Sequence, residues 1–201
     1  YRKAAEQGFA PAQRNLGNCY KYGDGVEENL VKAAEWLQKA AEQGDKIAQN
    51  NIGCCYERGK GVEKDLIKAT EWYRKAAEQG WAIAQYNLGM FYEQGKGRIT
   101  KNSERAFEWY WKAAELGYPP AQNKLGDCYK YGKGAIIDFA DAAKWYRKAA
   151  EQGNKTAQFN LGNCYYFGHG VAKDQAKAAE WYWHAALISP RAFCAALLPI
   201  N

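Results

Sequence analysis

The hydrophobic pattern alternates between two amphipathic helical segments joined by a short glycine turn. In the first copy, residues 10–22 place small and apolar side chains on one helical face, and residues 29–43 carry a second apolar stripe that includes Trp36. A Gly-x-Gly string between the two segments supplies a helix cap and a turn. Gly44 then ends the second segment. The pattern therefore predicts a helix, a tight turn and a returning helix.

This pattern recurs with a period of 36 or 37 residues. The period is marked by a tryptophan in each second helix, at Trp36, Trp72, Trp109, Trp145 and Trp181. Fixed self-similarity at such a period is typical of a helical repeat array. The sequence thus predicts an all-α solenoid, in which a partial helix at 1–7 precedes five helix pairs at about 10–43, 46–79, 82–116, 119–152 and 155–187.

Two further positions in each first helix indicate how a pair packs. A glycine at 17, 53, 89, 126 and 162 is interpreted as the point where the partner helix comes close. A second position holds Cys19, Cys55, Cys128 or Cys164, with Phe91 in the third copy, which is typical of an apolar core slot. Equivalent positions on stacked helices lie about 8–10 Å apart, beyond the roughly 7 Å that a disulfide can bridge. We therefore expect reduced thiols and a cytoplasmic or similar compartment.

The third repeat and the C-terminal end depart from the pattern. The third repeat has one extra residue in its connecting loop, 98–103, and the low cost of loop insertions favours a benign length change. The repeats end at about 189, and Ser189-Pro190 is typical of a new helix start. Residues 190–201 are interpreted as a degenerate cap or tail over the last apolar edge, or alternatively as an apolar docking strip. Tyr1 aligns with Tyr73, so we expect the chain to begin inside a helix of a longer protein.

Three strings of the third repeat resemble the Sel1-like repeat, a longer relative of the tetratricopeptide repeat. They are the run 84–89 (Ala-Gln-Tyr-Asn-Leu-Gly), the pair Gly95-x-Gly97, and the run 109–115 (Trp-Tyr-x-Lys-Ala-Ala-Glu). The likeness extends over residues 1–187, and the tetratricopeptide period of 34 residues is too short for this chain. The resemblance implies a right-handed α/α superhelix that serves as a scaffold or adaptor for a protein or peptide partner. A cysteine-rich branch staples each helix pair with a disulfide, and the repeats here lack the second cysteine.

The likeness to tetratricopeptide arrays also implies a concave groove lined by the first helices. One column that would line it consists of Asn15, Asn51, Asn87, Lys124 and Asn160. An amide donates and accepts at once, so these residues suit an extended peptide, or equally they bond the backbone of the neighbouring repeat. Flanking positions vary between copies, as expected of a specificity surface: Arg14, Asn50, Tyr86, Asn123 and Phe159, and on the turn side Lys130, Tyr131 and Tyr166. Aromatic and basic side chains are typical interface anchors.

The sequence offers little for catalysis or for a metal. The two histidines, His169 and His184, have no cysteine or carboxylate at metal-ligand spacing. Neither serine, Ser103 or Ser189, begins a Ser-x-x-Lys motif. We therefore expect a non-enzymatic protein without metal or cofactor. No apolar run approaches the roughly 20 residues of a membrane span, so no membrane partner is expected. The given residues contain no signal peptide, but one could precede Tyr1, so a secreted or lumenal location stays open as the alternative to the cytoplasm.

Charge separates the alternatives for the partner. The net charge of +6, from 28 basic and 22 acidic residues, is small for a dedicated nucleic-acid binder. Helical-repeat arrays with aromatic and basic residues can nevertheless bind RNA, so an RNA-binding module is the alternative. Glu57, Glu93 and Asp127 in the candidate groove argue against it. A third hypothesis is a module that associates with itself end to end.

Overall fold

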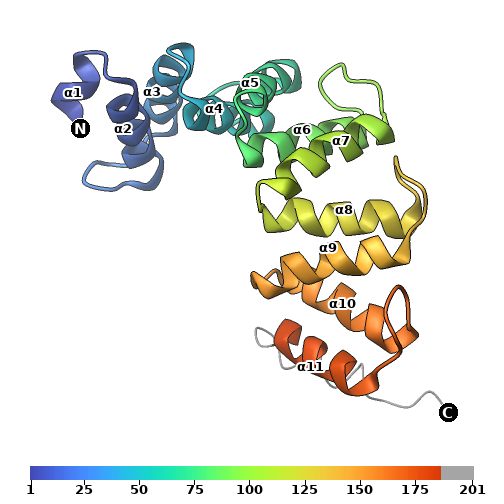
Figure 1. The fold of residues 1–201 in the computed structure, drawn as a ribbon. Helices are drawn as coiled ribbons and strands as arrows, with labels where there is room; N and C mark the ends of the chain where they lie inside the picture. The colour runs from blue at the N-terminus through green and yellow to red at the C-terminus, as the bar shows by residue number, and fades with distance from the viewer. Residues whose placement is uncertain (187–201) are drawn as a thin grey trace. The chain divides into compact units, whose positions relative to one another are not determined.

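The computed structural model describes residues 1–186, and all regular secondary structure in that range is helical (Figure 1). The predicted partial helix and the five predicted helix pairs are confirmed. The helices are α1 (Arg2–Glu6), α2 (Ala10–Tyr22), α3 (Leu30–Glu42), α4 (Lys46–Arg58), α5 (Leu66–Glu78), α6 (Ala82–Gln94), α7 (Ser103–Glu115), α8 (Pro119–Tyr131), α9 (Phe139–Glu151), α10 (Lys155–Phe167) and α11 (Gln175–Ala186). The predicted cap or tail at 190–201 lies outside the described residues.

The chain divides into two compact units, residues 1–109 and residues from 110 onward. In the first unit, neighbouring helices pack in chain order from α1 to α6. In the second unit, α8, α9, α10 and α11 follow one another in the same way. Each unit is therefore a stack of helix pairs, the architecture that the period predicts.

Helix ends follow from the turn residues in each repeat. The first helices α2, α4, α6, α8 and α10 each end at a glycine in the left-handed conformation, such as Gly23 with φ 71°. Second helices begin at a polar cap, and the Asp65 carboxylate accepts from the backbone N–H groups of Ile67 and Lys68. The hydrogen bond from Lys68 is the main cause that lowers the pKa of Asp65. Local sequence therefore fixes where each helix starts and stops.

Close packing at the first-helix glycine is confirmed. A Cβ atom added at Gly53 would lie 2.8 Å from the Tyr73 ring, and one at Gly126 would lie 2.6 Å from the Tyr146 ring. The core slot is confirmed in four copies, where Cys55, Cys128, Cys164 and Phe91 are buried, whereas Cys19 in the first copy is only half-buried. The described cysteines Cys19, Cys54, Cys55, Cys128 and Cys164 are free thiols.

A column of buried glutamines, whose role the sequence did not reveal, joins each repeat to the preceding helix. Each amide donates at 3.1–3.2 Å to a carbonyl oxygen eight residues earlier, in the pairs Gln13–Ala5, Gln49–Ala41, Gln85–Ala77, Gln122–Ala114 and Gln158–Ala150. These carbonyls belong to the last turn of a helix, and each also accepts from the backbone N–H of the glycine three residues later. The glutamines therefore give the end of each preceding helix a second donor and tie it to the next repeat.

A second glutamine, at the C-terminal end of the second helix in the first, second and fourth repeats, completes the network. Its amide donates to the Oε1 atom of a buried glutamine at 2.6–2.8 Å, in the pairs Gln43–Gln13, Gln79–Gln49 and Gln152–Gln122. In the third repeat this position is Leu116. The buried Oε1 atom of Gln85 has no hydrogen-bond partner in the described part of the chain.

Candidate protein-binding surface

The asparagine column of the first helices bonds between repeats. The Asn87 amide donates to Oδ1 of Asn50, and the Asn160 amide donates to Oδ1 of Asn123, both at 3.0 Å. Asn87 and Asn160 therefore bond a side chain of the neighbouring repeat and not its backbone. All five members of the column, Asn15, Asn51, Asn87, Lys124 and Asn160, are half-buried.

The variable column beside it is more enclosed than expected of a specificity surface. Asn50 and Asn123 are buried, and each accepts a hydrogen bond from an asparagine amide of the next repeat. Arg14 forms a 2.8 Å ion pair with Asp45, the residue that caps α4. Tyr86 is half-buried, whereas Phe159 is exposed, with its ring 5.4 Å from the ring of Tyr182. In most copies this column therefore contributes contacts between repeats.

Acidic groups on the first helices are held by tyrosine hydroxyls of the second helices. Tyr146 donates to Asp127 at 2.7 Å, and Tyr73 donates to Glu57 at 2.8 Å. Burial raises the pKa of the Asp127 carboxyl, while the hydrogen bond from Tyr146 and the nearby lysines oppose this shift. The same burial, with the carboxylate beside it, raises the pKa of the Tyr146 hydroxyl. Glu57 also lies 3.6 Å from Lys96 in an ion pair.

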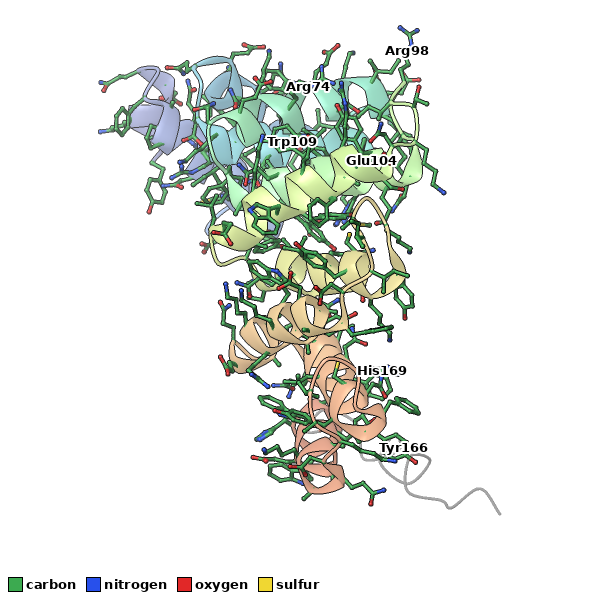
Figure 2. The ribbon with its side chains drawn as sticks, turned by 45° about the vertical axis from the view of Figure 1, so that its right-hand side comes forward. Arg74, Arg98, Glu104, Trp109, Tyr166 and His169 are labelled. Carbon is green, nitrogen blue, oxygen red and sulfur yellow. The ribbon has the colours of Figure 1, made fainter. Side chains whose placement is uncertain are left out.

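Four rings gather between the fourth and fifth repeats and form what we call the aromatic cluster: Phe139, Tyr166, Phe167 and His169. The His169 ring stacks on Phe139 at 4.9 Å and on Phe167 at 5.5 Å, and Tyr166 meets Phe167 edge-on at 4.9 Å. Tyr166 and His169 are labelled in Figure 2, on the second unit. The cluster joins the start of α9 to the end of α10.

A cavity of about 150 Å³ lies beside the aromatic cluster. Its lining combines Phe139, Phe167 and His169 of the cluster with polar atoms from Lys130 and Asn163. The Lys130 ammonium group also lies 4.9 Å from the centre of the exposed Tyr131 ring. Of the predicted site residues, Lys130 thus lines the cavity and Tyr166 contacts the aromatic cluster, whereas Tyr131 contacts Lys130.

Two members of the aromatic cluster, Phe139 and His169, were missed in the sequence. They are 30 residues apart, and their contact depends on how the turn of one repeat meets the helix start of the repeat before it. Gly170 lies against the backbone carbonyl of Phe139, and a side chain there would collide with it. An available signal was that His169 replaces an aspartate or lysine found in the other copies.

Within residues 1–186, no three histidine, cysteine, aspartate or glutamate side chains are placed to hold a metal ion. None of the described helices is both long and apolar enough to cross a membrane. What the surface offers is apolar area, ring faces and ammonium groups, which contribute to recognition by burial and by cation–π contact.

Helix pairs of this length, with a close-packed glycine and a buried glutamine in each, define a helical-repeat protein. A family model described as Sel1 repeat matches residues 1–9, 10–45, 46–81, 82–118, 119–154 and 155–185. The chain belongs to the Sel1 repeat family. Sel1 repeat proteins generally mediate protein–protein interactions.

Solved structures of similar proteins agree with this assignment. A protective antigen of uropathogenic Escherichia coli with the same fold is 40% identical, with a TM-score of 0.87 over 92% of this chain. The chain spans only 39% of that protein. A Sel1 repeat protein from Oxalobacter formigenes is 40% identical, with a TM-score of 0.83, and the match covers 90% of this chain and 74% of that protein.

A third similar structure belongs to the cysteine-rich branch. Cysteine rich protein B of Helicobacter pylori is 30% identical, with a TM-score of 0.52, and the match covers 67% of this chain and 96% of that protein. Among curated protein sequences, no significant match to the chain was found.

Proposed function

We propose that the chain is a non-catalytic interaction scaffold that binds a protein or peptide partner through the surface of its first helices. Its anchor is the aromatic cluster of the fourth and fifth repeats. In each unit, members of the asparagine column contribute polar groups to this surface: Asn15, Asn51 and Asn87 in the first unit, and Lys124 and Asn160 in the second. Membership of the Sel1 repeat family supports the general role in protein binding. The aromatic cluster supports the proposed location of the binding site.

The observation that carries the proposal is the exposure of the cluster. Phe139, Tyr166 and Phe167 keep 41%, 46% and 58% of their surface accessible, although they already contact one another. Contiguous exposed aromatic area is typical of binding sites, because leaving it in water is unfavourable. The fitting partner is an extended segment with an apolar or aromatic side chain for the cavity. An acidic residue beside that side chain would meet Lys130.

A peptide-display selection against the chain tests this proposal. Selected peptides should contain an apolar residue next to an acidic one. Their binding should weaken by about tenfold or more in the double variant Phe139→Ala/Phe167→Ala, because anchor residues typically contribute more than about 1.4 kcal/mol each. Tyr22→Ala is the matched control, since Tyr22 holds the position of Phe167 in the first repeat and is also exposed.

Two results would reject the proposal. If selected peptides bind the double variant as tightly as the wild-type chain, the cluster is not the anchor. If binding to an RNA oligonucleotide dominates and its affinity falls steeply with salt, the RNA-binding alternative is correct instead.

A further inference from the structure

A second cavity, in the first unit, is lined by three arginines and is distinct from the aromatic cluster. Its volume is about 380 Å³, and its lining includes Arg74 of α5, Arg105 of α7, Tyr92 of α6, and Arg98 and Thr100 of the loop between α6 and α7. In Figure 2, Arg98 extends outward from this loop, and Arg74 lies along the same edge of the first unit. None of the described lining residues is acidic.

Comparison with other repeats indicates that Arg74 has lost its structural role. At the same repeat position, Arg147 donates to the Tyr165 hydroxyl at 2.8 Å, and Arg2 donates to the Tyr20 hydroxyl at 3.2 Å. In the third repeat the equivalent hydroxyl, that of Tyr92, accepts from Arg105 at 3.3 Å. Within residues 1–186, the Arg74 guanidinium takes part in no hydrogen bond or ion pair. Its five N–H donors are therefore available to a ligand.

Arg98 is the residue that the longer loop adds, and its backbone is unusual. It has φ 64°, which makes it the non-glycine residue with a left-handed backbone in the described part of the chain. For a residue other than glycine, asparagine or aspartate this conformation costs roughly 1–2 kcal/mol. Strained backbone of this kind is found disproportionately at ligand sites. The Arg98 guanidinium likewise forms no hydrogen bond or ion pair with residues 1–186.

We propose that this arginine cavity binds a phosphate group, presented by free phosphate or by a phosphorylated side chain. A phosphate monoester has three terminal oxygens and close to two negative charges, which suits three planar guanidinium groups better than a single carboxylate would. The Tyr92 and Thr100 hydroxyl groups add neutral donors. Asp65, whose charge interacts with Arg98, and Glu108, whose charge interacts with Arg105, are not part of the lining.

Titrations with three probes test this inference on the full chain at constant ionic strength near 0.15 M. The probes are inorganic phosphate, the peptide acetyl-Gly-phosphoserine-Gly-amide, and the same peptide without phosphate. Binding is followed by calorimetry and by NMR of the arginine side-chain N–H signals. We expect saturable one-to-one binding of inorganic phosphate and of the phosphoserine peptide, and no binding of the peptide without phosphate. The variant Arg74→Ala/Arg98→Ala should bind them about tenfold or more weakly, since a charge-assisted hydrogen bond contributes about 1.5–3 kcal/mol.

Arg147→Ala is the matched control, because Arg147 has the repeat position of Arg74 but already bonds Tyr165. It should leave phosphate affinity unchanged. Arg98→Gly separates binding from folding, since it removes the guanidinium and relieves the left-handed strain. We expect it to bind phosphate more weakly without melting at a lower temperature. Tighter binding of the phosphopeptide than of inorganic phosphate would identify a phosphorylated side chain as the ligand, and the reverse order would identify free phosphate.

The inference is overturned if phosphate binding does not saturate, or if Arg74→Ala/Arg98→Ala binds as well as the wild-type chain. Either result would mean an adventitious ion only. Because the cavity and the aromatic cluster lie in different units, this result is independent of the peptide selection. A failure to bind phosphate would leave the proposed partner surface unaffected. A failure of the peptide selection would likewise leave the proposed phosphate site unaffected.

Discussion

Each tyrosine of the second helices needs an acceptor for its hydroxyl, and the acceptor differs from repeat to repeat. Tyr146 uses Asp127 and Tyr182 uses Asn163, both at 2.7 Å. An amide and a carboxylate thus accept the same hydrogen bond in the same geometry. The carboxyl group, however, can ionise, and burial disfavours its charged form.

The first prediction is that Asp127→Asn removes a pH-dependent loss of stability. Burial raises the native-state pKa of Asp127 above its ordinary value of 3.8. Between the ordinary and the raised pKa the native state holds more protons than the unfolded state, so stability falls as pH rises through that window. Asp127→Asn should therefore be more stable than the wild-type chain above the window, and the difference should shrink as pH falls below it.

Chemical denaturation of both proteins between pH 3 and 7 measures this difference. Asp24→Asn, a change at an exposed turn position, is the control. A constant difference between wild type and Asp127→Asn at every pH would show that the carboxyl does not titrate with folding.

The second prediction concerns Asn18, whose buried Oδ1 atom has no hydrogen-bond partner among residues 1–186. Asn18 occupies the repeat position of Asp127 and Asn163, but the residue 19 positions later is Leu37 instead of tyrosine. Gly17 lies against Leu37, as Gly126 lies against Tyr146. Leu37→Tyr should supply the missing donor and be about 1 kcal/mol more stable than Leu37→Phe.

The Leu37→Phe variant carries the same ring without the hydroxyl, so the comparison cancels any effect of ring size on packing. Urea denaturation of the two variants gives the difference in the free energy of unfolding. Equal stabilities would mean that the hydroxyl at position 37 does not reach Asn18.

At the scale of helices, the glutamine network ties the first helix of a repeat to the second helix of the same repeat and to the second helix of the preceding repeat. Gln152 donates to Gln122, and Gln122 donates to the carbonyl of Ala114. The exposed end of this chain of bonds is Gln152, whereas Gln122 is buried. Removing the exposed member leaves a buried acceptor without a donor, which is more costly than the loss of a surface contact.

The third prediction is therefore that Gln152→Ala destabilises the chain by about 1–2 kcal/mol. The adjacent Glu151→Ala, also exposed and at the end of the same helix, should cost only a few tenths of a kcal/mol in comparison. Thermal unfolding of both variants measures the difference. If both changes cost the same, the effect belongs to the helix end and not to the glutamine network.

Sequence periodicity predicted the helices and their packing points because each copy repeats the same steric requirement. Gly126 and Cys128 are examples, since only a small residue fits under the Tyr146 ring and only an apolar one fits the core slot. Periodicity could not identify atom pairs between repeats. Two examples are the hydrogen bond from Asn87 to Asn50 and the stacking of His169 on Phe139. Both depend on how one repeat is displaced relative to the next, and the sequence of one repeat does not determine that displacement.

At the scale of the whole molecule, the buried cysteines of the core slot allow native packing to be measured at the same position in three repeats. Cys55, Cys128 and Cys164 are buried in equivalent places, two of the three in the second unit. Burial is the main cause that raises the pKa of the Cys55 and Cys164 thiols. Since the thiolate is the reactive form, both burial and the raised pKa protect these residues. Cys54, next to Cys55, is half-buried and serves as an internal comparison.

The fourth prediction is that iodoacetamide at pH 7.5 labels Cys54 of the native chain well before Cys55, Cys128 and Cys164. These three residues should react only as fast as the chain unfolds, and in denaturant all four should react at similar rates. Peptide mass spectrometry after timed quenching gives the rate at each site. A reducing agent should leave the melting temperature unchanged, because the described cysteines are free thiols in the folded chain. Labelling of Cys55 in native buffer as fast as Cys54 would contradict the packing of the repeat core.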